Sequence, residues 1–281
     1  MNCNKKQAKE IRKRTREFLK YSKLTRYVLL QSFALYNSSP KLDFIEDLLQ
    51  HELSKITDVV NILERIFQKN FDKMLDVDTP KHCELDYPKF LLSRCALLCP
   101  KPTYSSFLLV SAFLSRFIFR EAPSKECCGI LYIGEFCLLV LYRRLFRKIF
   151  HSVGGYQNLE KFCNEFHKNF TEDSTLSDLR KTRVSENWIN VVQDCVNATD
   201  VHFSLKDIEI KVFEECYSSI NYMEYKSENL QKIESVLFPF RCDGCKKKSF
   251  CKYCGCKCHN YLVHARQFIC KFQVKIIHCK Y

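Results

Sequence analysis

The last forty residues of this chain hold a dense group of side chains that can bind metal ions. Eight of the eighteen cysteines fall there, and three histidines lie among them. The candidate ligands are Cys242, Cys245, Cys251, Cys254, Cys256, Cys258, His259, His264 and Cys270, followed by His278 and Cys279. Thiolate and imidazole are the ligands that tetrahedral Zn²⁺ prefers, and a Cys-x-x-Cys pair brings two sulfurs to one ion. The spacing therefore predicts bound zinc, as one ion or two.

Two ligand sets are compatible with this spacing. In the first, Cys242 and Cys245 are followed after thirteen residues by His259 and then by His264, as in finger-like sites, and Cys258 could replace His259. In the second, one ion is held by four cysteines, which are Cys242, Cys245, Cys251 and Cys254. Cys256, Cys258, His264, Cys270 and Cys279 then remain for a second ion. Both sets stay open at the level of sequence.

The predicted zinc is expected to be structural. Forty residues with a small apolar content need a staple to fold, and a metal can supply that folding free energy. Catalytic zinc needs an open position and a nearby general base, and the tail contains a single acid, Asp243. A thiolate store for Cu(I) is an alternative for the Cys-x-Cys run at residues 254–258, although a long helical body is not expected in a storage protein.

Basic and aromatic side chains lie between the predicted metal ligands. Seven basic residues are candidates to contact nucleic acid: Lys246, Lys247, Lys248, Lys252, Lys257, Arg266 and Lys271. A loop fixed by metal can present lysines to phosphates and rings such as Phe250 and Tyr253 to bases. The alternative is a module that docks proteins, in which the rings form its own small core and the lysines are solvated.

The body of the chain shows no comparable chemistry. Its cysteines are expected to be buried apolar thiols; they include Cys127, Cys128, Cys137, Cys163, Cys195 and Cys216. A further metal site at a proline-rich bend is an alternative for His82, Cys83, Cys95 and Cys99. Glycine is scarce, with six in all, and no phosphate-binding glycine loop, nucleophile elbow or metalloprotease helix occurs. We therefore expect a protein that is not an enzyme.

The net charge of +13 is concentrated at the two ends of the chain. Residues 1–26 carry ten Lys or Arg against two Glu, and residues 241–281 carry ten against one Asp. Such ends attract polyanions, and the first could also be a nuclear-import signal or a solvated helix face. These shifts divide the chain into a basic N-terminal segment (1–26), an α-helical body (27–238) and a basic Cys/His-rich zinc module (239–281).

Hydrophobic periodicity predicts the elements that carry these residues. Apolar residues over 45–74 recur at steps of three and four, which is typical of one or two amphipathic helices. Helices are also predicted over 5–36, 88–98, 104–120, 126–150, 157–170, 174–183, 185–198 and 205–236, with a strand as an alternative at 201–210. Pro100, Pro102 and Pro123 are expected to end helices, and Trp188 to anchor the core. The predicted fold is mainly α: a multi-helix globular body with a small C-terminal cysteine-rich zinc-binding module.

Two strongly apolar runs are expected to be core helices rather than membrane spans. Residues 104–119 contain Arg116 and residues 130–142 contain Glu135, and neither reaches the length of about 18 uncharged residues that a spanning helix needs. The basic start lacks an apolar signal region, so we expect a reducing compartment, nucleus or cytoplasm, in which the cysteines are thiols or metal ligands.

The stretch Tyr27–Tyr36, followed by Phe44–Leu53, resembles late-gene regulators of large DNA viruses, whose AT-rich genomes suit a Lys/Asn/Phe/Tyr/Cys-rich composition. The resemblance implies a transcription regulator or assembly factor that acts purely through protein–protein contacts. The residues themselves favour a non-enzymatic regulatory or adaptor protein, whose body binds protein partners and whose tail contacts DNA, RNA or a nucleoprotein complex. An enzyme with a site built from scattered residues is the third alternative. The sequence leaves the partner and the oligomeric state open.

Overall fold

The computed structural model describes residues 2–36, 51–76, 85–125, 129–182, 186–198 and 202–218. These residues are mainly helical and include no strand, so the all-α prediction is confirmed for the part of the chain that the structure describes. Every predicted zinc ligand and every basic residue assigned to the tail module lies outside the described residues.

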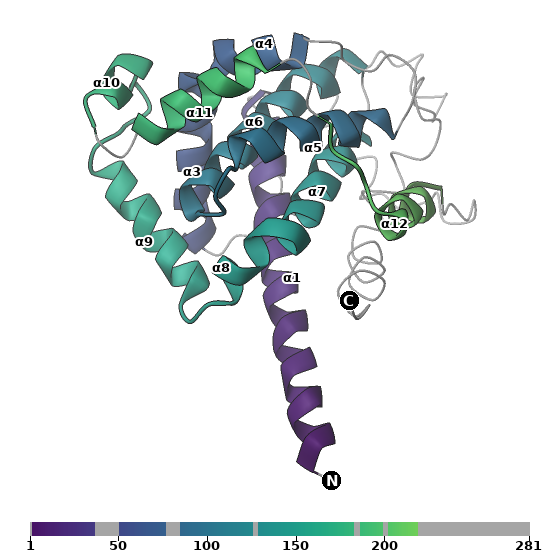
Figure 1. The fold of residues 1–281 in the computed structure, drawn as a ribbon. Coiled ribbons are helices and arrows are strands. Elements are labelled where there is room, and N and C mark those ends of the chain that lie inside the picture. Colours follow the sequence, from purple (N-terminus) through teal and green to yellow (C-terminus); the bar gives the residue numbers. More distant parts are fainter. Residues whose placement is uncertain are drawn as a thin grey trace, which may run out of the picture.

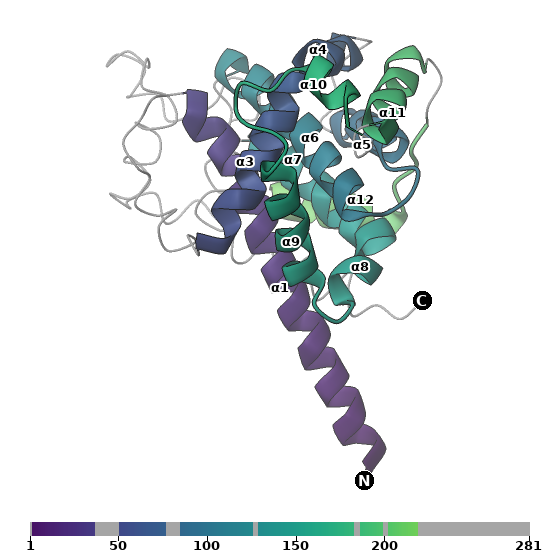
Figure 2. The ribbon, with the colours of Figure 1, turned by 90° about the vertical axis from the view of Figure 1, so that its left-hand side faces the viewer.

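The longest described element is α1 (Asn2–Tyr36), which confirms the helix predicted over 5–36. Its N-terminal half projects away from the other helices and its C-terminal half runs among them (Figures 1 and 2). Phe18, Tyr21 and Leu24 lie at helical spacing and are fully buried, and the Tyr21 hydroxyl donates to the carbonyl of Leu138 at 3.0 Å. The second half of α1 therefore anchors the helix, and the basic first half is carried outward.

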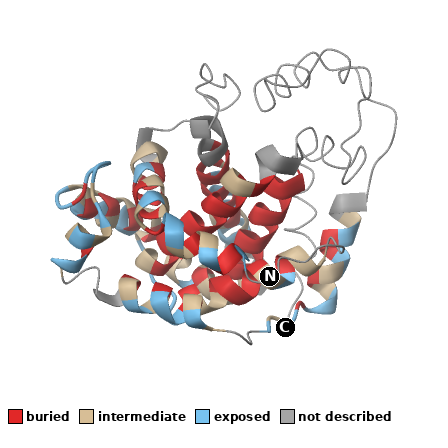
Figure 3. Cartoon of the chain, turned by 90° about the horizontal axis from the view of Figure 1, so that it is seen from above, coloured by how far each residue is buried: buried red, intermediate tan, exposed pale blue. Residues whose placement is uncertain are grey.

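The core is built around α6 (Tyr104–Lys125) and α7 (Gly129–Leu141), the two apolar runs of the sequence. Residues 106–118 and all of α7 are buried, as the red helices in the middle of Figure 3 show. Around α6 pack α1, α7, α3 (His51–Ile66), α4 (Gln68–Asp76) and α5 (Asp86–Leu98). None of the described helices combines the length and the apolar character that crossing a membrane requires.

The remaining helices complete the outside of the body. They are α9 (Gly155–His167), α10 (Leu176–Arg180), α11 (Glu186–Asn197) and α12 (Asp207–Ser218). Arg94 of α5 fixes the end of α11, because its Nη1 donates to the carbonyls of Ala198 at 2.7 Å and Cys195 at 3.3 Å. A cation at a helix C-terminus satisfies carbonyls that have no partner within the helix. Trp188 is 3% exposed and packs near Phe162 and Phe166, as expected of a core anchor.

The structure differs from the predicted elements at three places. The segment predicted as one helix over 126–150 consists of α7, a π-helical segment η1 (Tyr142–Phe146) and α8 (Arg147–His151). The helix α6 continues through Pro123 to Lys125. The alternative strand at 201–210 is wrong for its described residues, since 202–206 have no regular structure and α12 begins at Asp207.

The chain reverses direction at Gly154 and Gly155, between α8 and α9. Gly154 has a φ of 74°, a left-handed conformation that glycine adopts at no steric cost. A Cβ on Gly155 would lie 2.6 Å from the carbonyl oxygen of Phe150. Both glycines are therefore needed to fold α9 back along the body.

Candidate polyanion-binding groove

The described body offers a basic groove that the sequence analysis did not single out. This basic groove is an open hollow of about 590 Å³ lined by Arg14, Pro102, Arg143, Arg144, Leu145, Arg147, Lys148 and His151. Five of these residues carry a permanent positive charge, and no acidic residue is among the described lining residues. A concave surface of one sign of charge concentrates ions of the opposite sign, so the groove suits a polyanion.

Four segments bring the groove together. Arg14 comes from α1, Pro102 from the link between α5 and α6, and the other residues from η1 and α8. The helices α1 and α8 are in contact, so residues more than a hundred positions apart in the chain share one surface. The half of α1 that projects from the other helices begins near α8 (Figure 1).

The π-helical segment η1 carries Arg143 and Arg144, two of the basic residues that line the groove. The amide of Arg147 donates to the carbonyl of Tyr142, which is the five-residue spacing of a π-turn. Tyr142, Phe146 and Phe150 point into the core, where they are almost completely buried. Because the aromatic side chains take the inner face, the basic residues between them are left on the outer face, and single π-turns in helices are frequent at functional sites.

Beneath the groove lies a cluster of aromatic rings that gives it a rigid floor. The ring centroids of Tyr21 and Tyr142 are 4.4 Å apart, and those of Tyr21 and Phe150 are 5.1 Å apart. Burial raises the pKa of the Tyr142 hydroxyl well above its usual range, although nearby Arg147 acts to lower it. Tyr142 therefore stays neutral and acts through packing.

Glu209 of α12 holds two of the groove arginines from behind. Its side chain is fully buried, it forms a two-pronged ion pair with the Arg144 guanidinium, and it lies 3.5 Å from Nη1 of Arg143. Arg144 also donates to the Ser204 carbonyl and lies over the Phe203 ring, 4.5 Å from its centroid. Arg144 is thus held in place by Glu209, Ser204 and Phe203, while Arg14, Arg147 and Lys148 supply charge from other positions around the groove.

A second cationic surface runs along α1. Arg12, Arg16, Lys20 and Lys23 are exposed and follow one another at steps of four, four and three, so they share one face of the helix. The opposite face carries the buried Phe18 and Tyr21. A helix with apolar and cationic faces along the same turns is anchored on one side and presents charge on the other.

The other candidate sites divide into those the structure tests and those it does not. The metal ligands Cys242, Cys245, Cys251, Cys254, Cys256, Cys258, His259, His264 and Cys270 lie outside the described residues, as do the basic residues Lys246, Lys247, Lys248, Lys252, Lys257, Arg266 and Lys271. Within the described residues, no group of three or more His, Cys, Asp or Glu could hold a metal ion. The alternative metal site at the proline-rich bend includes His82 and Cys83, which lie outside the described residues. Its Cys99 thiol donates a hydrogen bond to Ser106 Oγ at 3.4 Å.

The described body cysteines are buried thiols, as predicted. Cys137, Cys163 and Cys195 are fully buried. Burial raises the pKa of Cys163 and Cys195 to about 12, so both thiols are protonated at neutral pH. Burial likewise raises the pKa of Cys137 above its usual range. The side chains of Cys127, Cys128 and Cys216 are not among the described ones.

Sequence reasoning missed the basic groove, although one signal for it was present. The run Arg143-Arg144-Leu145-Phe146-Arg147-Lys148 is the densest basic stretch of the described body, and it is interleaved with residues that point inward. Comparison with known proteins adds nothing to this picture, since no family, curated protein or solved structure matches the chain.

Proposed function

We propose that this protein is a non-enzymatic regulator that binds nucleic acid with its helical body, through the basic groove and the cationic face of α1. The observation that carries the proposal is the groove, in which Arg14 of α1 meets Arg147 and Lys148 of α8 with no acidic lining residue among those described. Phosphate contacts by Lys and Arg supply most of the affinity of nonspecific nucleic-acid binding. The proposed ligand is therefore a polyanion read through its phosphates.

The predicted zinc module would be a second contact on the same ligand. One or two zinc ions would fold the tail and present its lysines, in a nuclear or cytoplasmic protein whose body also binds protein partners. The alternative function is the one implied by the viral regulators that the chain resembles, a transcription regulator or assembly factor working through protein contacts alone. An enzyme with a dispersed site is the third candidate.

The groove can be tested by a charge-neutralising pair that leaves the fold intact. Arg14 and Lys148 are exposed and come from different helices, so Arg14→Gln with Lys148→Gln should not unfold the body. We expect the affinity of the full chain for a labelled 20-base-pair DNA duplex to fall by about tenfold or more, measured by fluorescence anisotropy.

A matched control separates the groove from general charge. Lys161→Gln with Arg180→Gln removes the same charge from exposed positions on α9 and α10. This control should bind within about twofold of the native protein, a difference smaller than 0.5 kcal/mol. Equal losses in the two double variants, or no binding of native protein to DNA or RNA at low salt, would favour the protein-contact alternative.

A further inference from the structure

A second cavity, separate from the basic groove, has the opposite electrostatic character. It has a volume of about 300 Å³, opens between α3, α4 and α6, and shares no lining residue with the groove. Asp58, Glu64 and Glu172 line it together with Arg65 and Arg116. Asp72 adds a further carboxylate through its ion pair with Arg116, so four carboxylates face two guanidiniums.

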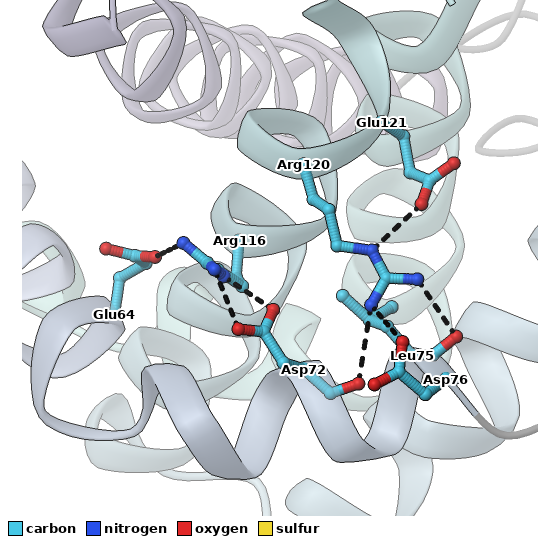
Figure 4. A network of polar contacts seen from close by, with 7 residues as sticks. All are labelled: Glu64, Asp72, Leu75, Asp76, Arg116, Arg120 and Glu121. Carbon is cyan, nitrogen blue, oxygen red and sulfur yellow. Dashed lines mark hydrogen bonds and ion pairs between the residues drawn. The ribbon is translucent and has the colours of Figure 1, made fainter. Parts of the chain in front are cut away.

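The guanidinium of Arg116 is saturated by its own partners. It donates from Nε and Nη2 to the two Asp72 oxygens at 2.8 and 2.7 Å, and from Nη1 to Glu64 at 3.2 Å. Figure 4 shows the Glu64 and Asp72 carboxylates on either side of this guanidinium. Arg120 makes a neighbouring set of bonds to Asp76 and Glu121, so it does not add positive charge to the cavity. Arg116 therefore completes the acidic wall and is not available to bind an anion.

The carboxylates of the cavity are only partly compensated. Burial raises the pKa of Glu64 in spite of Arg116, and burial also raises the pKa of Asp58 in spite of His167, which faces it. The Arg65 pair with Glu172 spans 3.7 Å between two exposed side chains, and such exposed pairs stabilise little. An additional cation in the cavity would relieve this excess of negative charge.

Ser115 supplies an independent indication of a missing ligand. It lines the cavity, it is 1% exposed, and its buried hydroxyl oxygen has no hydrogen-bond partner among the described residues. A buried polar atom without a partner is unfavourable, because it has lost its hydrogen bonds to water. A ligand N–H group placed in the cavity would give this oxygen a donor.

We propose that this cavity binds an organic cation, a primary ammonium or guanidinium group carried on a short alkyl chain. The carboxylates provide the charge, the Ser115 hydroxyl an acceptor, and the Phe119 ring an apolar wall for the alkyl part. A bare metal ion fits less well, because no group of three metal-ligating side chains forms among the described residues. This site is independent of the proposed nucleic-acid binding.

Calorimetric titration of nucleic-acid-free full chain with agmatine, which carries both cationic groups, tests the proposal. We expect saturable binding to one site, and Asp58→Asn should weaken it by about tenfold. Asp194→Asn, an exposed change on α11, is the matched control and should bind agmatine like the native protein. Butylurea, which has a similar shape and no charge, should not bind.

Ser115→Ala distinguishes a ligand site from a structural ion-pair network. Because the hydroxyl has no partner among the described residues, its removal should leave the urea midpoint of unfolding unchanged or higher while weakening agmatine binding. The proposal fails if native protein does not bind agmatine at millimolar concentration, if butylurea binds equally well, or if Asp194→Asn weakens binding as much as Asp58→Asn.

Two sources of the cation can be separated in the same titration. Binding of an acetylated Gly-Arg-Gly amide with an affinity equal to that of agmatine assigns the site to an arginine side chain of a protein partner. Binding of agmatine without the peptide assigns it to a free small molecule. Both results support recognition of an organic cation. If neither agmatine nor the peptide binds, the proposal is overturned.

Discussion

Glu209 is the residue on which the geometry of the basic groove depends. Its carboxylate is buried, pairs with Arg144 and Arg143, and accepts a hydrogen bond from the Lys206 amide at 2.9 Å. It thereby links the start of α12 to η1. A buried carboxylate between two arginines fixes their direction, and the Arg143 and Arg144 side chains are themselves only 11% and 22% exposed.

Glu209→Gln should therefore lower the free energy of unfolding by about 2 kcal/mol. Breaking a fully buried pair is unfavourable by about 3–5 kcal/mol, and the partial exposure of the arginines reduces the effect. Urea unfolding followed by circular dichroism measures the change. Glu214→Gln, an exposed change on the same helix, is the control and should leave the midpoint unchanged. Equal midpoints for Glu209→Gln and the native protein would show that this pair is not structural.

At the scale of elements, the body was predictable wherever apolar spacing alone determines structure. The helix α1 and the buried runs of α6 and α7 lie at the predicted positions. The spacing of apolar residues along the chain indicates whether a helix is buried on one face or on all faces. The π-turn at Tyr142–Phe146 was not predictable, since it depends on how Tyr142 and Phe146 pack against α1 and α6. Within α12, Glu209 is followed at steps of three and four by Val212 and Phe213, and the burial of all three suits a helix face better than an alternating strand.

The candidate site could be predicted from the sequence even less than the helices. The basic run at 143–148 is visible in the sequence, but its juxtaposition with Arg14 depends on the contact between α1 and α8, which no local pattern encodes. The acidic cavity likewise depends on contacts between α3, α4 and α6, which Arg116 connects. The sequence shows its charged residues but not that they lie together. The zinc ligands could be predicted from residue type and spacing. These ligands lie outside the described residues, so their assignment stays a prediction.

The proposed polyanion ligand would contact two basic surfaces of the protein, one on the body and one in the tail. The tail can be tested through its metal. Purified protein is expected to carry one or two equivalents of zinc, and Cys242→Ser with Cys245→Ser should remove at least one, because the first Cys-x-x-Cys pair is shared by both ligand sets.

Mass spectrometry of the metal content and circular dichroism together make this test specific. The double variant should keep the helical signal of the body, and Cys163→Ala, which changes a buried thiol of α9, should keep its zinc. Full zinc content in the Cys242 and Cys245 variant would refute the ligand assignment.

The most direct test of nucleic-acid binding by the body is the salt dependence of affinity, compared between native protein and the Arg14→Gln, Lys148→Gln variant. The logarithm of the association constant for duplex DNA should fall linearly with the logarithm of salt concentration, and each phosphate contact contributes about −0.9 to the slope. If both groove residues contact phosphates, the variant should have a slope shallower by about 2. Identical slopes for the two proteins would contradict the account, since the groove would then make no contact with the polyanion.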